Sequence, residues 1–171
     1  DPAVRLEAVD AFEEHAVVSM RRDGLSRLAV LDGEGALTEI DFDEPIYAVG
    51  AGDNPDYASR LLRLSYTSMV TPASVYDYDI DDAELHLRKR TPVLGGIDPA
   101  AYRQHREWAT AADGTRVPIS IVARADVAAD GTAPCLLYGY GSYEHSIDPY
   151  FSIARLSLLD RGVVFAIAHV R

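Results

Sequence analysis

The sequence lacks most of the residues that mark membrane, secreted or metal-binding proteins. One cysteine in 171 residues, Cys135, excludes an internal disulfide framework and leaves too few thiols for a zinc cluster. No apolar run approaches the roughly 20 residues of a membrane-spanning helix, and the first residues lack the cationic start and apolar core of a signal peptide. We therefore expect no membrane partner, and we expect the cytoplasm, a reducing compartment, as the location.

A complete catalytic set is also missing. Neither Ser26 nor Ser142 stands in a G-x-S-x-G nucleophile motif. The five histidines are dispersed, without an H-E-x-x-H or Cys/His grouping, and no phosphate-binding glycine loop is present. These patterns predict no metal and no cofactor. Cys135, beside Pro134 and two leucines, is expected to pack as a buried strand thiol.

Positive charge is scarce in the first part of the chain. Residues 1–95 carry 19 acidic against 9 basic residues, a balance of −10, whereas residues 96–171 carry 8 against 7, a balance of −1. Nucleic acid is therefore excluded as a partner, because neutralising phosphates requires clustered lysine and arginine. An acidic surface either attracts cationic peptides or only keeps the protein soluble.

Short runs typical of β-strands follow one another through residues 1–95. Turn clusters such as Arg-Arg-Asp-Gly at 21–24 separate them, and Asp-Gly pairs tolerate the positive φ that tight hairpins need. In residues 60–68, Leu62, Leu64 and Tyr66 share one face and the polar residues share the other, which predicts a strand with one buried side. Residues 75–79 and 84–88 alternate likewise. Four-stranded antiparallel units at this spacing suit propeller blades or a sandwich.

Composition changes at residues 91–99, where two prolines and two glycines mark a linker. Beyond it, two strands at 102–109 and 117–123 are predicted to form a hairpin. An apolar strand at 134–138, a helix at 152–162 and a strand buried on both faces at 163–168 then predict the opening of an α/β sheet. Ser152 is expected to cap the helix, Ile153, Leu156 and Leu159 to form its apolar stripe, and Gly162 to end it.

The segment Tyr-Gly-Tyr-Gly at 138–141 follows the apolar strand directly. Glycines on both sides let the backbone turn and approach a ligand, so Tyr140 is predicted to lie at the carboxyl edge of the sheet, where open α/β proteins bind ligands. A phenol there can donate a hydrogen bond to a developing oxyanion. The same pattern also fits two aromatic residues that only pack at a strand end.

Several blocks, in the same order, resemble the prolyl oligopeptidase family of serine peptidases, and within it the oligopeptidase B group. They are YGYGSY at 138–143, IDP at 147–149, FS at 151–152, RLSLLDRG at 155–162, AIAHVR at 166–171, SYTSMVTPASVYDYD at 65–79 and GTRVPIS at 114–120. Glu144 and His145 depart from the family, which more often has small or apolar residues at these positions.

The resemblance implies a β-propeller followed by an α/β-hydrolase domain. Residues 1–95 are then the last propeller blades, and residues 96–171 are the first strands and helix of the hydrolase (peptidase) domain. Tyr140 falls on the family's oxyanion tyrosine, while the catalytic Ser, Asp and His lie in the sequence that follows. We therefore expect this sequence to be an internal segment, inactive alone, whose sheet has an unpaired edge after Val170.

By the same resemblance, the substrates are short peptides cleaved after Arg or Lys. The partners are those basic peptides and the remainder of the parent chain. Two alternatives stay open: a proline-specific oligopeptidase of the same family, and a noncatalytic propeller-type module that binds cationic peptides on its acidic surface.

Overall fold

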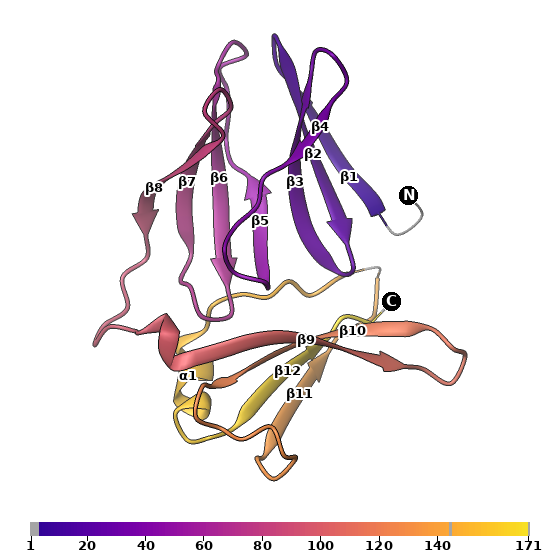
Figure 1. The fold of residues 1–171 in the computed structure, drawn as a ribbon, viewed down its shortest axis with the longest axis vertical. Coiled ribbons are helices and arrows are strands. Elements are labelled where there is room, and N and C mark those ends of the chain that lie inside the picture. The colour runs from indigo at the N-terminus through magenta and orange to yellow at the C-terminus, as the bar shows by residue number, and fades with distance from the viewer. Residues whose placement is uncertain (1–3, 144, 171) are drawn as a thin grey trace.

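The structure, a computed structural model, describes residues 4–143 and 145–170, which form twelve strands and one α-helix (Figure 1). The first eight strands are β1 (Val4–Ala11), β2 (His15–Arg22), β3 (Leu25–Asp32), β4 (Leu37–Glu39), β5 (Tyr47–Ala51), β6 (Leu61–Ser68), β7 (Ser74–Asp79) and β8 (Glu84–Arg90). The later elements are a 3-10 turn (Pro99–Ala101), β9 (Tyr102–Thr110), β10 (Arg116–Arg124), β11 (Cys135–Gly139), α1 (Ile153–Leu159) and β12 (Val164–Ala168).

Strands β1–β4 and β5–β8 form two antiparallel four-stranded sheets, each in plain chain order. This arrangement confirms the predicted succession of β-hairpins. Along β6, Leu62, Leu64 and Tyr66 are buried and the intervening side chains are not, as the period-two pattern predicts. These three residues help to form the hydrophobic core that the two sheets share.

The β2–β3 turn projects from the first sheet toward the third. Asp23 and Gly24 alone separate Arg22 from Leu25, which pair across the hairpin, and both turn residues have positive φ, +52° and +78°. Glycine adopts this conformation without steric cost, which explains the Asp-Gly pair.

The third sheet has the order β11-β12-β10-β9 and lies across one end of the other two sheets (Figure 1). Strand β10 is antiparallel to β9 and β12, whereas β11 and β12 are parallel and connected through α1. The Ser152 hydroxyl accepts a hydrogen bond from the Arg155 amide at 3.3 Å, which confirms the predicted N-cap. The helix ends at Leu159 with Asp160 as its C-cap, earlier than predicted, and Gly162, with a φ of +82°, turns the chain two residues after that cap.

Strand β11 contradicts two predictions. Cys135 is exposed, not buried, and Leu137 on the same strand is 62% exposed. Among the described residues β11 pairs with β12 alone, so it is an edge strand and lacks the neighbour that would cover its side chains. Strand β12 is paired on both sides, so the expected edge after Val170 is wrong; within the described residues the edge strands of this sheet are β11 and β9. The crossover through α1 places β12 inside the sheet.

Two finer expectations also fail. Ile153 does not continue the buried stripe of Leu156 and Leu159: it is 63% exposed, because it lines an open cavity of about 300 Å³ beside residues 91–93. Asp77, expected on the polar face of β7, is buried. Arg63 and Arg88 cover its carboxylate, with closest contacts of 2.8 Å from each, and hydrogen bonding to Arg63 and then Arg88 holds the pKa of Asp77 below its usual range.

A second hydrophobic core joins the third sheet to the other two. Leu25 of β3 and two loop residues, Ile46 just before β5 and Met69 just after β6, pack with Leu159 and Ile167 from α1 and β12. All five side chains are almost completely buried. Burial of this kind fixes the position of the third sheet against the ends of the other two, and with it the edge that carries Tyr140.

Candidate functional site at the carboxyl end of strand β11

Tyr140 follows the last residue of β11 directly, at the end of the third sheet. Because β11 and β12 are parallel, with Gly139 opposite Ala168, their carboxyl ends meet at one edge of the sheet. Tyr140 is 38% exposed, and its ring contacts that of His145 edge to face, with 5.9 Å between centroids. The side chain is thus held beside the loop and remains open to solvent on one side.

The structure gives Gly139 a different role from the one expected. It lies in extended strand backbone, and a Cβ atom there would meet Ala168 at 3.6 Å or more, an ordinary contact distance. The positive φ in this loop belongs to Tyr143, at +57°. Glu144, singled out from the sequence, lies outside the described residues.

The loop that begins at Tyr140 is attached to the first two sheets at two points. Asp148 accepts hydrogen bonds from the Arg21 guanidinium of β2 at 2.6 and 3.4 Å. The Phe151 amide donates to the Thr67 hydroxyl of β6 at 3.2 Å. A paired guanidinium and carboxylate restrain both orientation and distance. The loop that follows Tyr140 is therefore positioned by the first two sheets as well as by its own strand.

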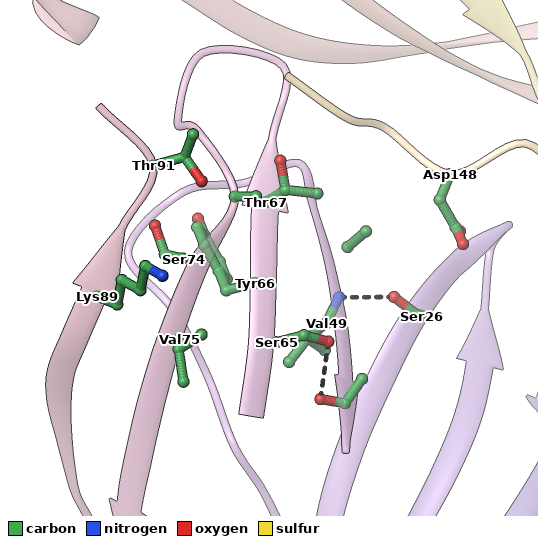
Figure 2. A pocket seen from close by; sticks show the side chains of 13 residues that line it. Ser26, Val49, Ser65, Tyr66, Thr67, Ser74, Val75, Lys89, Thr91 and Asp148 are labelled. Carbon is green, nitrogen blue, oxygen red and sulfur yellow. Dashed lines mark hydrogen bonds between the residues drawn. The ribbon is translucent and has the colours of Figure 1, made fainter. Parts of the chain in front are cut away.

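Asp148 also lies at a cavity of about 530 Å³ formed mainly by the second sheet (Figure 2). Many hydroxyl groups line it, and most are already used: the Ser26 hydroxyl accepts from the Val49 amide at 2.9 Å, and that of Ser65 donates to the Gly50 carbonyl at 3.2 Å. The hydroxyls of Tyr66, Thr67 and Ser74 also donate to other groups. Figure 2 shows Lys89 on the opposite side of the cavity from Asp148. The lining can hold polar groups of either charge.

A serine and a histidine meet at the same sheet edge, but they are enclosed. The Ser120 hydroxyl lies 2.7 Å from His169 Nε2, with side chains 0% and 7% exposed. The Gly24 turn covers His169: a Cβ atom on Gly24 would lie 3.0 Å from the Cβ of the histidine. A substrate carbonyl cannot reach Ser120, so Ser120 and His169 do not act as a catalytic nucleophile and its general base. The pair instead stabilises the contact between the sheets.

Burial, followed by the nearby Arg106 charge, lowers the pKa of His169 to about 4 from 6.5. The folded state is therefore fully stable with respect to this histidine above pH 6.5. As the pH falls from 6.5 toward 4, His169 is protonated in the unfolded chain but stays neutral in the folded chain, so the free energy of unfolding decreases. We expect the wild type to lose about 3 kcal/mol at most through this group.

The test compares urea unfolding at pH 7 and pH 4.5 for wild type and His169→Gln. The variant is expected to be less stable at pH 7 and to lose less stability on acidification. His145→Gln, which removes an exposed loop histidine, is the matched control. An equal loss of stability on acidification in wild type and His169→Gln would contradict the assignment.

Glu44, in the loop between β4 and β5, connects the second and third sheets through one carboxylate. It accepts hydrogen bonds from the hydroxyls of Tyr66, Ser68 and Thr71 and from the side-chain amide of Gln104 on β9. Burial, and then the Glu44 charge, raise the pKa of Tyr66 well above its ordinary value, so its phenol remains a donor. No pattern in the sequence indicates this cluster.

Other classes of site are not found in the described part of the chain. Residues 4–143 and 145–170 contain no group of three or more His, Cys, Asp or Glu side chains that could hold a metal ion. Within the same residues no helix is long and apolar enough to cross a membrane.

A sequence profile described as the prolyl oligopeptidase N-terminal β-propeller domain matches residues 2–91. The chain belongs to the prolyl oligopeptidase family. The matched residues include both antiparallel four-stranded sheets, which are therefore blades of a β-propeller. This confirms the propeller part of the predicted fold and the family resemblance.

Curated relatives of the family match almost the whole chain. Dipeptidyl aminopeptidase BI of Pseudoxanthomonas mexicana is 44% identical over 98% of this chain and 23% of its own length. Protease 2 of Moraxella lacunata is 34% identical over 97% of this chain and 24% of its own. The chain thus spans about a quarter of the length of these relatives.

Solved structures of the family share the fold. Oligopeptidase B from Trypanosoma brucei, closed and with covalently bound antipain, superposes with a TM-score of 0.86 at 39% identity, covering 99% of this chain and 25% of that one. Oligopeptidase B from Leishmania major gives a TM-score of 0.88 at 36% identity, covering 100% of this chain and 25% of that one. The superpositions cover the third sheet as well as the two blades.

Proposed function

We propose that the chain is part of a serine oligopeptidase in which Tyr140 stabilises the oxyanion of the transition state. In this proposal residues 1–95 are propeller blades, and residues 96–171 begin an α/β-hydrolase domain whose catalytic Ser, Asp and His lie later in a longer parent protein. The observation that carries the proposal is the place of Tyr140, at the carboxyl end of a parallel strand pair and on a loop attached to the propeller blades.

The geometry suits a hydrogen-bond donor in acyl transfer. When a serine hydroxyl attacks the peptide carbonyl, the C=O π bond opens and negative charge develops on its oxygen. The Tyr140 hydroxyl would donate to that oxygen, together with the backbone amide that follows the nucleophile. Such a donor works best when it is fixed beforehand, because no reorganisation is then needed during the reaction. The double attachment of the loop, through Asp148 and Phe151, supplies that fixation.

We further propose short peptides as substrates, with cleavage after Arg or Lys, and the cytoplasm as the compartment. The oligopeptidase B structures are similar to the chain, and cleavage after Arg or Lys is what the resemblance to that group implies. A proline-specific peptidase is the alternative, favoured by the similarity to prolyl endopeptidase of Elizabethkingia miricola, at 26% identity over 88% of this chain.

Chromogenic peptides that differ at one position test the proposal. With the parent protein, we expect kcat/KM to be at least about 100-fold higher for a peptide with Arg before the scissile bond than for its Pro counterpart. When an apolar side chain enters a pocket built for a charged one, the polar groups of the pocket are left without a partner. The 171-residue chain, assayed in parallel, is expected to show no turnover. A preference for Pro would favour the alternative, and turnover by the short chain would contradict the placement of the nucleophile.

A further inference from the structure

Arg155 on α1 is an enclosed cation with few hydrogen-bond acceptors around it. The residue is 5% exposed. Its guanidinium donates one hydrogen bond, from Nη1 to the Tyr150 carbonyl at 2.6 Å. The rings of Tyr150 and Phe165 lie 4.8 and 4.1 Å from the guanidinium carbon. The rings cover its faces, but N–H donors point outward in the plane of the group, where rings offer no acceptor.

No carboxylate balances this charge within the described residues. The ion pairs found there involve other arginines, such as Arg21, Arg63 and Arg124, and none involves Arg155. Burial accordingly lowers the pKa of Arg155 from its ordinary value. An enclosed charge of this kind is costly unless a group of opposite charge pairs with it, and a guanidinium pairs best with a planar, two-oxygen anion.

A cavity of about 210 Å³ opens beside the guanidinium. Leu158 and Phe165 contribute apolar wall, and Tyr138 and Ser152 bring hydroxyl-bearing side chains. Tyr138 and Tyr150 at its rim are 43% and 50% exposed, so the cavity is reachable from solvent. Its chemistry fits a carboxylate on a short aliphatic stem, because the stem meets apolar wall while the oxygens meet the free N–H donors.

We propose that the Arg155 cavity is a carboxylate-binding site. The carboxylate has two possible sources: an Asp or Glu side chain from a part of the parent protein outside these residues, or the C-terminal carboxylate of a bound peptide. Both present the same chemistry to Arg155. Because Tyr138 and Tyr150 lie on either side of Tyr140 in the sequence, the occupied site would also hold both ends of the Tyr140 loop.

Propionate is a probe of this site that does not depend on the proposed peptidase activity. In the 171-residue chain, added propionate should shift the NMR signal of the Arg155 Nε–H saturably, while propionamide, its neutral counterpart, should not. At a concentration ten times the dissociation constant, propionate should raise the ratio of folded to unfolded protein about tenfold. Sodium chloride at the same ionic strength corrects for screening.

Two variants make the result specific. Arg155→Met should lose the propionate effect while keeping the fold, because methionine suits the apolar wall; Arg161→Met, which removes an exposed arginine just after α1, should keep the effect. Should Arg155→Met fail to fold, Arg155→Lys tests the site, since lysine keeps the charge but loses the planar fork. A wild-type signal that does not move, or equal stabilisation of wild type and the folded Arg155 variant, would overturn the proposal.

The parent protein distinguishes the two sources. If an internal carboxylate fills the site, propionate has no effect on the wild-type parent protein, and Arg155→Met lowers its melting temperature. If the peptide supplies the carboxylate, Arg155→Met raises KM for peptides with a free C-terminus about tenfold and leaves KM for their amidated forms unchanged. If the folded parent protein shows neither of these effects, the proposal of a carboxylate at Arg155 is also refuted.

Discussion

Replacing Tyr140 by phenylalanine in the parent protein is expected to lower kcat by about 10²–10³-fold, with a much smaller change in KM. The expected loss corresponds to about 2.7–4 kcal/mol, the typical effect of removing one oxyanion donor. The ring is retained, so its edge-to-face contact with His145 and the packing of the loop remain. The hydroxyl is lost, and the charge that develops on the substrate oxygen then has one donor fewer.

The split between kcat and KM is what identifies the role. A donor that acts only in the transition state changes kcat, whereas a residue that binds substrate and transition state equally changes KM. Tyr143→Phe is the matched control, because Tyr143 is 94% exposed on the same loop and its hydroxyl is expected to contribute nothing. If kcat of Tyr140→Phe equals that of wild type, Tyr140 is not the oxyanion donor.

Local patterns in the sequence predicted most of the strands and missed two. Alternation located β6, and the Asp-Gly turn located the β2–β3 hairpin, because both signals lie within a few residues. Strand β1 was not predicted: the alternation that Val4 and Leu6 begin is interrupted where the register shifts between Leu6 and Ala8. Strand β4 has three residues, too few for a period to show.

Burial was predicted less well than secondary structure. Cys135 stands in an apolar run, and such a run indicates a buried strand wherever neighbours cover it; in the described chain β11 is an edge strand. Alternation in residues 75–79 places Asp77 on the polar face of its strand, yet Arg63 and Arg88 enclose it from positions 14 and 11 residues away. Both errors have the same cause: burial depends on what packs over a residue, and its own segment does not specify that.

The candidate site was predicted in part. The position of Tyr140 after a strand followed from the sequence, but the attachment of its loop did not. Arg21 and Asp148 are separated by 127 residues, and Phe151 and Thr67 by 84. No motif spacing indicates contacts of that range. The contact between Gly24 and His169 likewise depends on how the third sheet packs against the first, which the sequence pattern does not indicate.

The contacts of Glu44 predict a large loss of stability on its removal. Glu44→Ala is expected to lower the free energy of unfolding by about 3 kcal/mol, since hydrogen bonds to a charged group each contribute about 1.5–3 kcal/mol and are partly offset by solvation. Ser68 and Thr71 are 0% and 4% exposed, so their hydroxyls would lose an acceptor in a place that water reaches poorly. Gln104, on β9, would lose its bond across the contact between the propeller blades and the third sheet.

Urea unfolding of the 171-residue chain measures this loss, and amide hydrogen exchange locates it. Exchange should accelerate in β9 and at residues 66–71, where the partners of Glu44 lie, more than in β2. Asp43→Ala, the removal of an exposed acid beside Glu44, is the matched control and should change stability by less than about 0.5 kcal/mol. Equal stabilities of the two variants would mean that the carboxylate adds nothing beyond its charge. Faster exchange confined to residues 66–71 would place the Glu44 contacts within the blade, with the third sheet held by its hydrophobic core and its other contacts, such as that of Asp148 with Arg21.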